Sequence, residues 1–165
     1  MTSSGRIAPS FRFLLAHPAH LIACGFGSGL APIAPGTFGT LFAWASFPLL
    51  QHALDDRSFL LFIVAAFACG VLACERTGRA LGVTDHGAIV WDEIVPFWLV
   101  LLLTPAGWLW QTAAFLLFRF FDIVKLPPAN YFDEQVKNGF GVMMDDVAAA
   151  FHTLLVLAVA RFVIG

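Results

Sequence analysis

Long apolar runs separated by short polar segments form the main pattern along the chain. Each run is close to the lower limit of about 17 residues that a helix needs to cross hydrocarbon. They predict an all-α fold, a polytopic membrane bundle of about five spans that forms one domain over residues 1–165. The predicted spans are Phe38–Leu54, Ser58–Cys74, Ala88–Leu103, Leu109–Val124 and Val147–Ile164.

The composition supports a membrane setting. Hydrophobic residues make up 59% of the chain, charged residues make up 12%, and the mean hydropathy is +0.83. Soluble domains carry about 25% charged residues. With a net charge of −2 and no basic patch, we expect the lipid bilayer and not nucleic acid as a partner. Residues 1–20 are polar enough to form a cytoplasmic or interfacial segment.

The positive residues predict an orientation. If the N-terminus is cytoplasmic, most of them fall on the cytoplasmic side, as the positive-inside rule requires. These are Arg6, Arg12, Arg76, Arg79, Arg119, Lys125 and Lys137, against only Arg57 and Arg161 outside. This topology also places the polar candidates described below at the cytoplasmic face of the membrane.

A glycine-rich stretch precedes the first predicted span. Five glycines and two prolines between Gly25 and Thr40 argue against a regular helix, so we expect a loop or re-entrant segment. Backbone N–H groups of such a loop can bind phosphate. A packing loop is an equally good interpretation. The candidate phosphate-binding residues are Ser28, Gly29, Gly36 and Thr37.

Acidic residues stand where the predicted helices begin or end. Asp92 and Glu93 lie inside an apolar run, where a carboxylate is costly unless a cation or water accompanies it. Asp122, Asp145 and Asp146 come from two further segments that meet the same membrane face. Carboxylates gathered in this way suit Mg²⁺. The alternatives are that Asp145 and Asp146 cap the last helix and that Asp92 pairs with an arginine.

Cationic and imidazole side chains accompany the acids. Arg119, Asp122 and Lys125 are spaced three residues apart and so share one helical face. The two cations could bind phosphate, although snorkelling to the headgroups is the alternative. His86 follows Asp85 at the entrance to the acidic helix. It could act as a general acid or as a substrate ligand.

Four motifs occur in order along the chain. They are Gly25–Leu30 with Ala34–Thr37, Asp85–Gly87 with Ile89–Glu93, Phe118–Asp122 with Lys125, and Gly141–Asp146. Together they resemble the phosphatidylglycerophosphatase A family of bacterial membrane lipid phosphatases, and the resemblance covers about residues 20–150.

This resemblance implies Mg²⁺-dependent hydrolysis of phosphatidylglycerol phosphate to phosphatidylglycerol and phosphate, at the cytoplasmic face of the bacterial inner membrane. Asp92, Glu93, Asp122 and His86 would be catalytic, and Arg119 and Lys125 would bind phosphate. The nucleophile stays open between a water molecule and an aspartate. The metal ligands would be Asp92, Glu93, Asp122, Asp145 and Asp146.

Two other functions use buried acids. A small cation transporter or channel would line an ion path with them, but it should also carry polar groups near the middle of several spans. A lipid phosphotransferase would need acidic metal ligands too. Such enzymes usually carry a longer D-G-x-x-A-R type signature on one helix, which this sequence does not contain.

Overall fold

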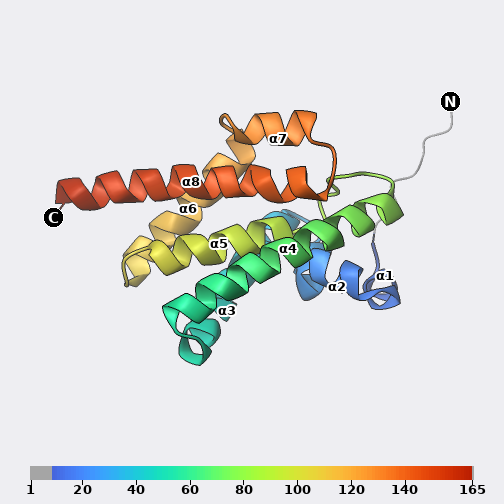
Figure 1. Ribbon diagram of the computed structural model, residues 1–165, viewed down its shortest axis with the longest axis horizontal. Coiled ribbons are helices and arrows are strands. Elements are labelled where there is room, and N and C mark those ends of the chain that lie inside the picture. Colours follow the sequence, from blue (N-terminus) through green and yellow to red (C-terminus); the bar gives the residue numbers. More distant parts are fainter. Residues whose placement is uncertain (1–8, 165) are drawn as a thin grey trace.

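The computed structural model describes residues 9–164. Residues 1–8, including Arg6 and the start of the predicted N-terminal segment, lie outside the described part. Within it the chain is helical, without a strand (Figure 1), which confirms the all-α prediction. The elements are α1 (Phe11–Ala16), α2 (Pro18–Ala23), the 3₁₀ helix η1 (Gly25–Leu30), α3 (Pro35–Ala53), α4 (Asp56–Leu81), α5 (Trp91–Leu103), α6 (Trp108–Val124), α7 (Ala129–Gln135) and α8 (Gly139–Ile164).

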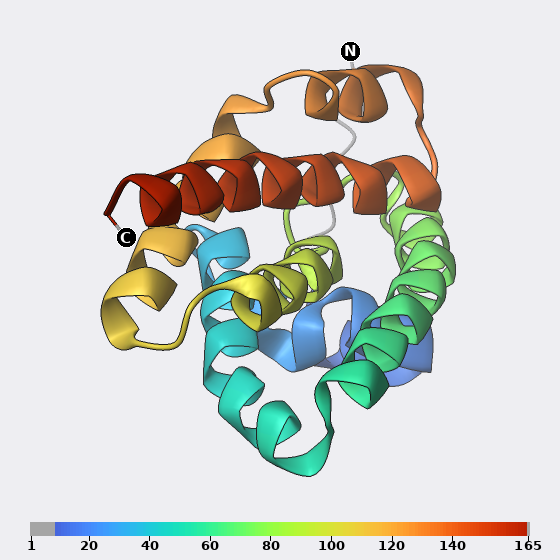
Figure 2. The ribbon, with the colours of Figure 1, turned by 60° about the vertical axis from the view of Figure 1, so that its left-hand side comes forward.

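Helix α5 is the centre of the bundle. It packs against α3, α4, α6 and α8, and Figure 2 shows it surrounded by these longer helices. Most of its side chains are buried, including Ile94, Phe97 and Trp98. A helix that is apolar on every side is expected in such an interior position. The first turn of α5 therefore carries Asp92 and Glu93 into the protein.

All five predicted spans form helices, but two are much longer than predicted. Helix α4 continues from Cys74 to Leu81, where Gly82 ends it in the left-handed conformation. Glutamate and arginine are good helix formers, so the end of the apolar run did not mark the end of this helix. Two helices, α4 and α8, are long and apolar enough by length and composition to cross a membrane.

The glycine-rich stretch has two different halves. In η1, Gly25, Phe26 and Gly27 have positive φ angles, so this half is irregular as predicted. The prediction of a loop is wrong for residues 35–40, because α3 begins at Pro35. Proline is well tolerated at the first position of a helix. Gly36 and Gly39 let α3 approach Glu93 and Val90 of the α5 segment closely.

Helix α8 begins eight residues before the predicted span. Asn138 Oδ1 accepts a hydrogen bond from the Gly141 N–H, and Glu75 Oε2 accepts one from the Gly139 N–H at 2.6 Å. These two side chains therefore accept hydrogen bonds from two of the N–H groups at the start of α8, where backbone N–H groups have no partner within the helix. Asp145 and Asp146 therefore lie well inside the helix, and the alternative that they cap it is wrong.

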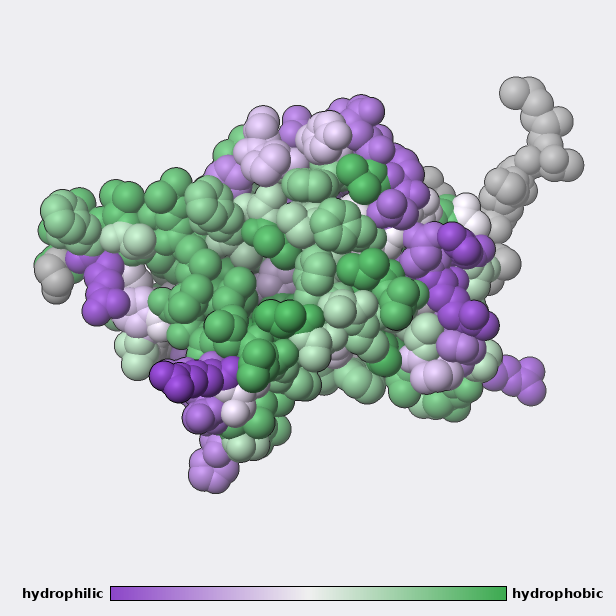
Figure 3. Space-filling view, in the orientation of Figure 1, coloured by the Kyte–Doolittle hydropathy of each residue, from purple (hydrophilic) through white to green (hydrophobic). Residues whose placement is uncertain are grey.

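The surface separates into apolar and polar regions. Figure 3 shows a broad hydrophobic face over α8, α5 and α4, with hydrophilic residues gathered over α7 and the end of α4. Large apolar side chains such as Leu61, Leu72 and Phe151 are exposed on this bundle. Exposed apolar area of this extent indicates a surface that contacts lipid or another apolar partner.

A substitution at Gly139 tests the packing of α8 on α4. A Cβ atom at Gly139 would lie 2.1 Å from the Val71 carbonyl oxygen, whereas one at Gly87 would meet nothing within 4 Å. We expect Gly139→Ala to lower the free energy of unfolding by about 2 kcal/mol, since the helices must separate. Gly87→Ala is the control. Thermal unfolding in detergent measures both, and equal midpoints would contradict the described packing.

Candidate functional site

Polar side chains from three helices, α5, α6 and α8, converge at one end of α5. Asp92 and Glu93 occupy its first turn, and α6 contributes Arg119 and Asp122 from its last turns. The end of α6 and the adjoining part of α8 supply the other members of the cluster, which are Lys125, Asp145 and Asp146. The sequence therefore correctly predicted that these segments meet.

Three acids form the buried part of the cluster. Side-chain oxygens of Asp92, Asp145 and Asp146 lie within 4.8 Å of one another, and these residues are only 6%, 4% and 3% exposed. In the part of the chain that the structure describes, Asp92 Oδ1 and Asp145 Oδ1 have no hydrogen-bond partner. Buried carboxylates require a compensating cation or proton. The arrangement therefore fits a metal ion with oxygen ligands.

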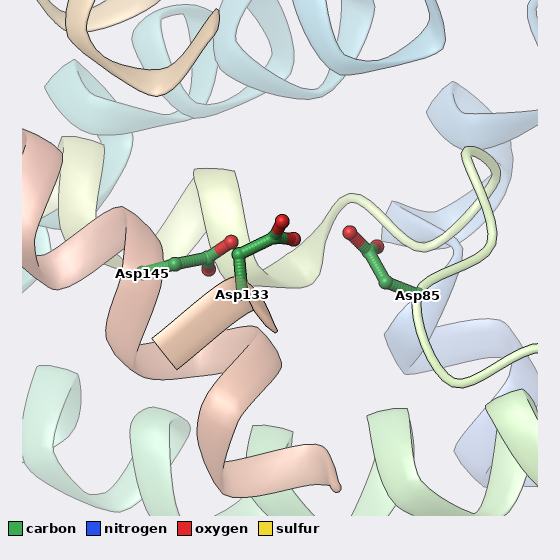
Figure 4. A group of neighbouring side chains, drawn as sticks. All are labelled: Asp85, Asp133 and Asp145. Carbon is green, nitrogen blue, oxygen red and sulfur yellow. The ribbon is translucent and has the colours of Figure 1, made fainter. Parts of the chain in front are cut away.

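Lys125 forms the second part of the cluster. Its Nζ lies 2.7 Å from both Asp133 Oδ1 and Asp145 Oδ2, and 3.9 Å from Asp85 Oδ2. In Figure 4, Asp85 points from its loop toward Asp133 of α7 and Asp145 of α8. Burial by itself lowers the pKa of Lys125, but Asp145 and Asp133 outweigh it and raise the pKa above the usual lysine value. Lys125 therefore forms ion pairs with both α7 and α8.

Arg119 forms the third part of the cluster. Its Nη1 contacts Glu93 Oε2 and lies 2.5 Å from Asp122 Oδ2. Thr40 Oγ1 lies 3.0 Å from the same Glu93 oxygen. Among the described residues, the buried Arg119 Nε has no partner. Two acids thus bind the same guanidinium nitrogen, Nη1. The Nε–H group is a further donor that could bind an anion.

The five predicted metal ligands separate into two groups. Asp92, Asp145 and Asp146 lie together, whereas Glu93 and Asp122 share Arg119. Which of them bind a metal stays a prediction.

The predicted phosphate-binding residues also separate. A Cβ atom at Gly36 would collide with Glu93, so Gly36 lies at the acidic cluster. The other groups make local bonds: Ser28 Oγ donates to the Gly25 carbonyl, the Gly29 N–H to Cys24, and the Thr37 N–H to Ala34. His86 Nδ1 accepts from the Ala88 N–H at 3.1 Å. His86 and Gly29 both border a separate pocket next to Asp85.

Three residues of the cluster were not predicted as site residues. Asp85 precedes the acidic helix in the sequence. It lies outside the apolar run, so the sequence gave no reason to expect a buried charge there. Asp133 stood in a polar stretch among other charges, and Thr40 stood in an apolar run. The spacing of eight residues between Lys125 and Asp133 was the available signal for the ion pair. That spacing predicts an ion pair only if α7 is known to fold back beside α8.

The fold and the site define an all-helical protein with a cluster of carboxylates and basic side chains at one end of an apolar bundle. Comparison with known families identifies which one. The family model of phosphatidylglycerophosphatase A matches residues 21–161, and the chain belongs to this family.

Several relatives are similar over most of the chain. A Haemophilus influenzae protein named phosphatidylglycerophosphatase A is 45% identical over 155 residues, 93% of this chain and 95% of the relative. The protein of the same name from Escherichia coli is 42% identical, covering 84% and 80%. A Bacteroides thetaiotaomicron protein, named as a candidate phosphatidylinositol-3-phosphatase, is 42% identical, covering 88% and 94%. No solved structure matches the chain.

The Arg119 ion pairs can be tested through stability. The side chains of Arg119, Glu93 and Asp122 are 12–15% exposed, so removing the cation leaves two nearly buried acids uncompensated. We expect Arg119→Met to lower the free energy of unfolding by about 3 kcal/mol. Arg161→Met, on the exposed end of α8, is the matched control. Denaturation of Arg119→Met at the wild-type midpoint would contradict this account of the cluster.

Proposed function

We propose that this protein is a phosphatase that hydrolyses phosphatidylglycerol phosphate to phosphatidylglycerol and inorganic phosphate. The observation that carries the proposal is the buried cluster of acids beside Arg119 and Lys125, in which two carboxylate oxygens have no partner among residues 9–164. A divalent ion would balance the charge of the buried acids, and a phosphate monoester bound with it would accept hydrogen bonds from Arg119 and Lys125. Membership of the phosphatidylglycerophosphatase A family and the names of two relatives point to the same lipid.

Mg²⁺ is the cofactor we propose. Asp92, Asp145 and Asp146 would hold it, since their oxygens are close together and two of them lack partners among the described residues. Mg²⁺ favours one or two carboxylates together with water and phosphate oxygens. When bound, it would offset charge on the phosphoryl group. Glu93 and Asp122 each give one carboxylate oxygen to Arg119, so while these ion pairs persist they could join the ligand set through their other oxygens.

The two cations would position the phosphate. Arg119 would donate to phosphoryl oxygens while Glu93 and Asp122 fix its orientation, and Lys125 would add positive charge from the α7 side. In the reaction, a water oxygen bonds to phosphorus, the bond from phosphorus to the glycerol oxygen breaks, and a proton passes to that oxygen. Positioning and charge stabilisation account for most catalysis of phosphoryl transfer.

We further propose that α3, α4, α5, α6 and α8 are the membrane-embedded helices and that the acidic cluster faces the cytoplasm. The turns between α3 and α4 and between α5 and α6 lie away from the cluster, as does the C-terminus (Figure 1). The positive-inside bias of the sequence supports a cytoplasmic position for the cluster. Helix α5 has only 13 residues, but its neighbours shield it from lipid.

A transporter is less well supported. The buried acids of the described chain are Asp92, Asp145 and Asp146, and all three gather in one cluster. Further along α8, the buried polar side chain Thr153 donates to the Ala149 carbonyl. This bond is local to the helix and offers no continuation of an ion path.

Phosphate release tests the proposed reaction. Purified protein in detergent should release phosphate from phosphatidylglycerol phosphate with Mg²⁺ and should stop when EDTA is in excess. Asp92→Asn should lower kcat by at least about 100-fold, because it removes a charged ligand. Asp56→Asn, at the far end of α4, is the matched control and should retain activity. Full activity in EDTA, or in Asp92→Asn, would contradict the proposed metal site.

A pair of cysteine variants tests the orientation. Gln135 on α7 and Gln51 near the end of α3 are both exposed, and the proposal puts them on opposite sides of the membrane. In a protein whose native cysteines are replaced, an impermeant maleimide added to right-side-out membranes should label Gln51→Cys and spare Gln135→Cys. Detergent should make both reactive. The reverse labelling pattern would show that the acidic cluster faces the opposite side of the membrane and would contradict the proposed orientation.

A further inference from the structure

The pocket next to Asp85 lies beside the acidic cluster and takes no part in the proposed chemistry. It has a volume of about 510 Å³ and lies between the loop that leads into α3 and the loop that leads into α5. Gly29 allows these loops to touch, since a Cβ atom there would lie 2.1 Å from the Ala88 carbonyl oxygen. The lining includes Asp85, His86, Gly87, Ala31 and Pro35.

Asp85 is the residue that the pocket and the cluster share. This residue lines the pocket, yet its carboxylate also lies 3.9 Å from Lys125 Nζ and within 4.8 Å of oxygens of Asp133 and Asp145. A molecule whose phosphate is bound at the cluster could therefore extend past Asp85 into the pocket. Ile33, in the loop before α3, is 79% exposed, so the segment that contributes Pro32 and Pro35 to the pocket also carries an apolar side chain suited to the lipid interface.

The polar groups of the pocket match a hydroxyl group. His86 Nδ1 accepts the Ala88 N–H, so the neutral imidazole carries its proton on Nε2 and can donate from there. The Asp85 carboxylate can only accept. A hydroxyl both accepts and donates, and can therefore bond to both side chains at once.

The charge of the pocket favours a neutral group over a second anion. Among the described lining residues, Asp85 is an acid and none is a lysine or arginine. A phosphodiester placed here would meet a negative carboxylate with no adjacent cation from that lining. A polyol meets no such penalty.

We propose that this pocket recognises the polyol of the lipid headgroup, with Asp85 and His86 bonding to the free hydroxyl next to the phosphate-bearing carbon. The inference rests on the proposed function, because the phosphate must first occupy the acidic cluster. It assigns His86 to substrate selection, one of the two roles that the sequence left open. In phosphatidylglycerol phosphate, the hydroxyl in question is on the central carbon of the headgroup glycerol.

The experiment compares two lipids that differ only in this hydroxyl: phosphatidylglycerol phosphate and an analogue whose headgroup is built on propane-1,3-diol. We expect the wild type to prefer the first by about 10- to 100-fold in kcat/KM, the effect of a hydrogen bond to a charged group. His86→Ala should reduce this ratio about 10-fold. His52→Ala, which removes an exposed histidine at the far end of α3, should keep the wild-type ratio.

A second variant tests whether the headgroup occupies the pocket. Gly87 lines the pocket and a Cβ there meets nothing within 4 Å, so Gly87→Leu should fold normally while it fills part of the pocket. We expect it to raise KM for phosphatidylglycerol phosphate about 10-fold, with kcat little changed.

The outcomes separate the two proposals. If the wild type releases no phosphate from either lipid, the proposed function itself fails. If it releases phosphate but His86→Ala keeps the wild-type ratio, or loses activity equally on both lipids, the assignment of His86 to the hydroxyl is overturned. An unchanged KM in Gly87→Leu would show that the headgroup does not occupy this pocket.

Discussion

The electrostatic cost of burying carboxylates is the constraint on which the rest of this structure depends. Asp92, Asp145 and Asp146 are nearly inaccessible to solvent. Among the described residues, they lie beside four further acids but two basic side chains, Arg119 and Lys125. Such an excess is unfavourable unless a positive ligand or protons balance it. The divalent ion that we propose would supply this positive charge.

The fold places this cluster by means of a short central helix. Because α5 is enclosed by its neighbours, its first turn presents Asp92 toward α8 and Glu93 toward α3 and α6. Gly36 makes room for Glu93 at the contact with α3. The two acids are adjacent in sequence, yet they serve different parts of the site: Asp92 joins the candidate metal ligands, and Glu93 holds Arg119.

The sequence predicted the helices and the convergence of acids well, because apolar runs and the cost of charge in an apolar setting are local signals. It did not predict the start of α8 at Gly139, since the capping groups there include Glu75, 64 residues away. It missed Asp133 and Thr40 for the same reason. Their partners, Lys125 and Glu93, become neighbours only when α7 folds beside α8 and α3 packs on α5.

Direct binding of Mn²⁺, observed by electron paramagnetic resonance, tests the central claim most directly. The account predicts that the wild type binds Mn²⁺, that Mg²⁺ displaces it, and that Asp146→Asn weakens the binding at least about 10-fold while the protein remains folded. The variant keeps the shape of the side chain and removes one charge from the buried group. Mn²⁺ binding of equal affinity in folded Asp146→Asn would contradict the assignment of these three acids as the metal site.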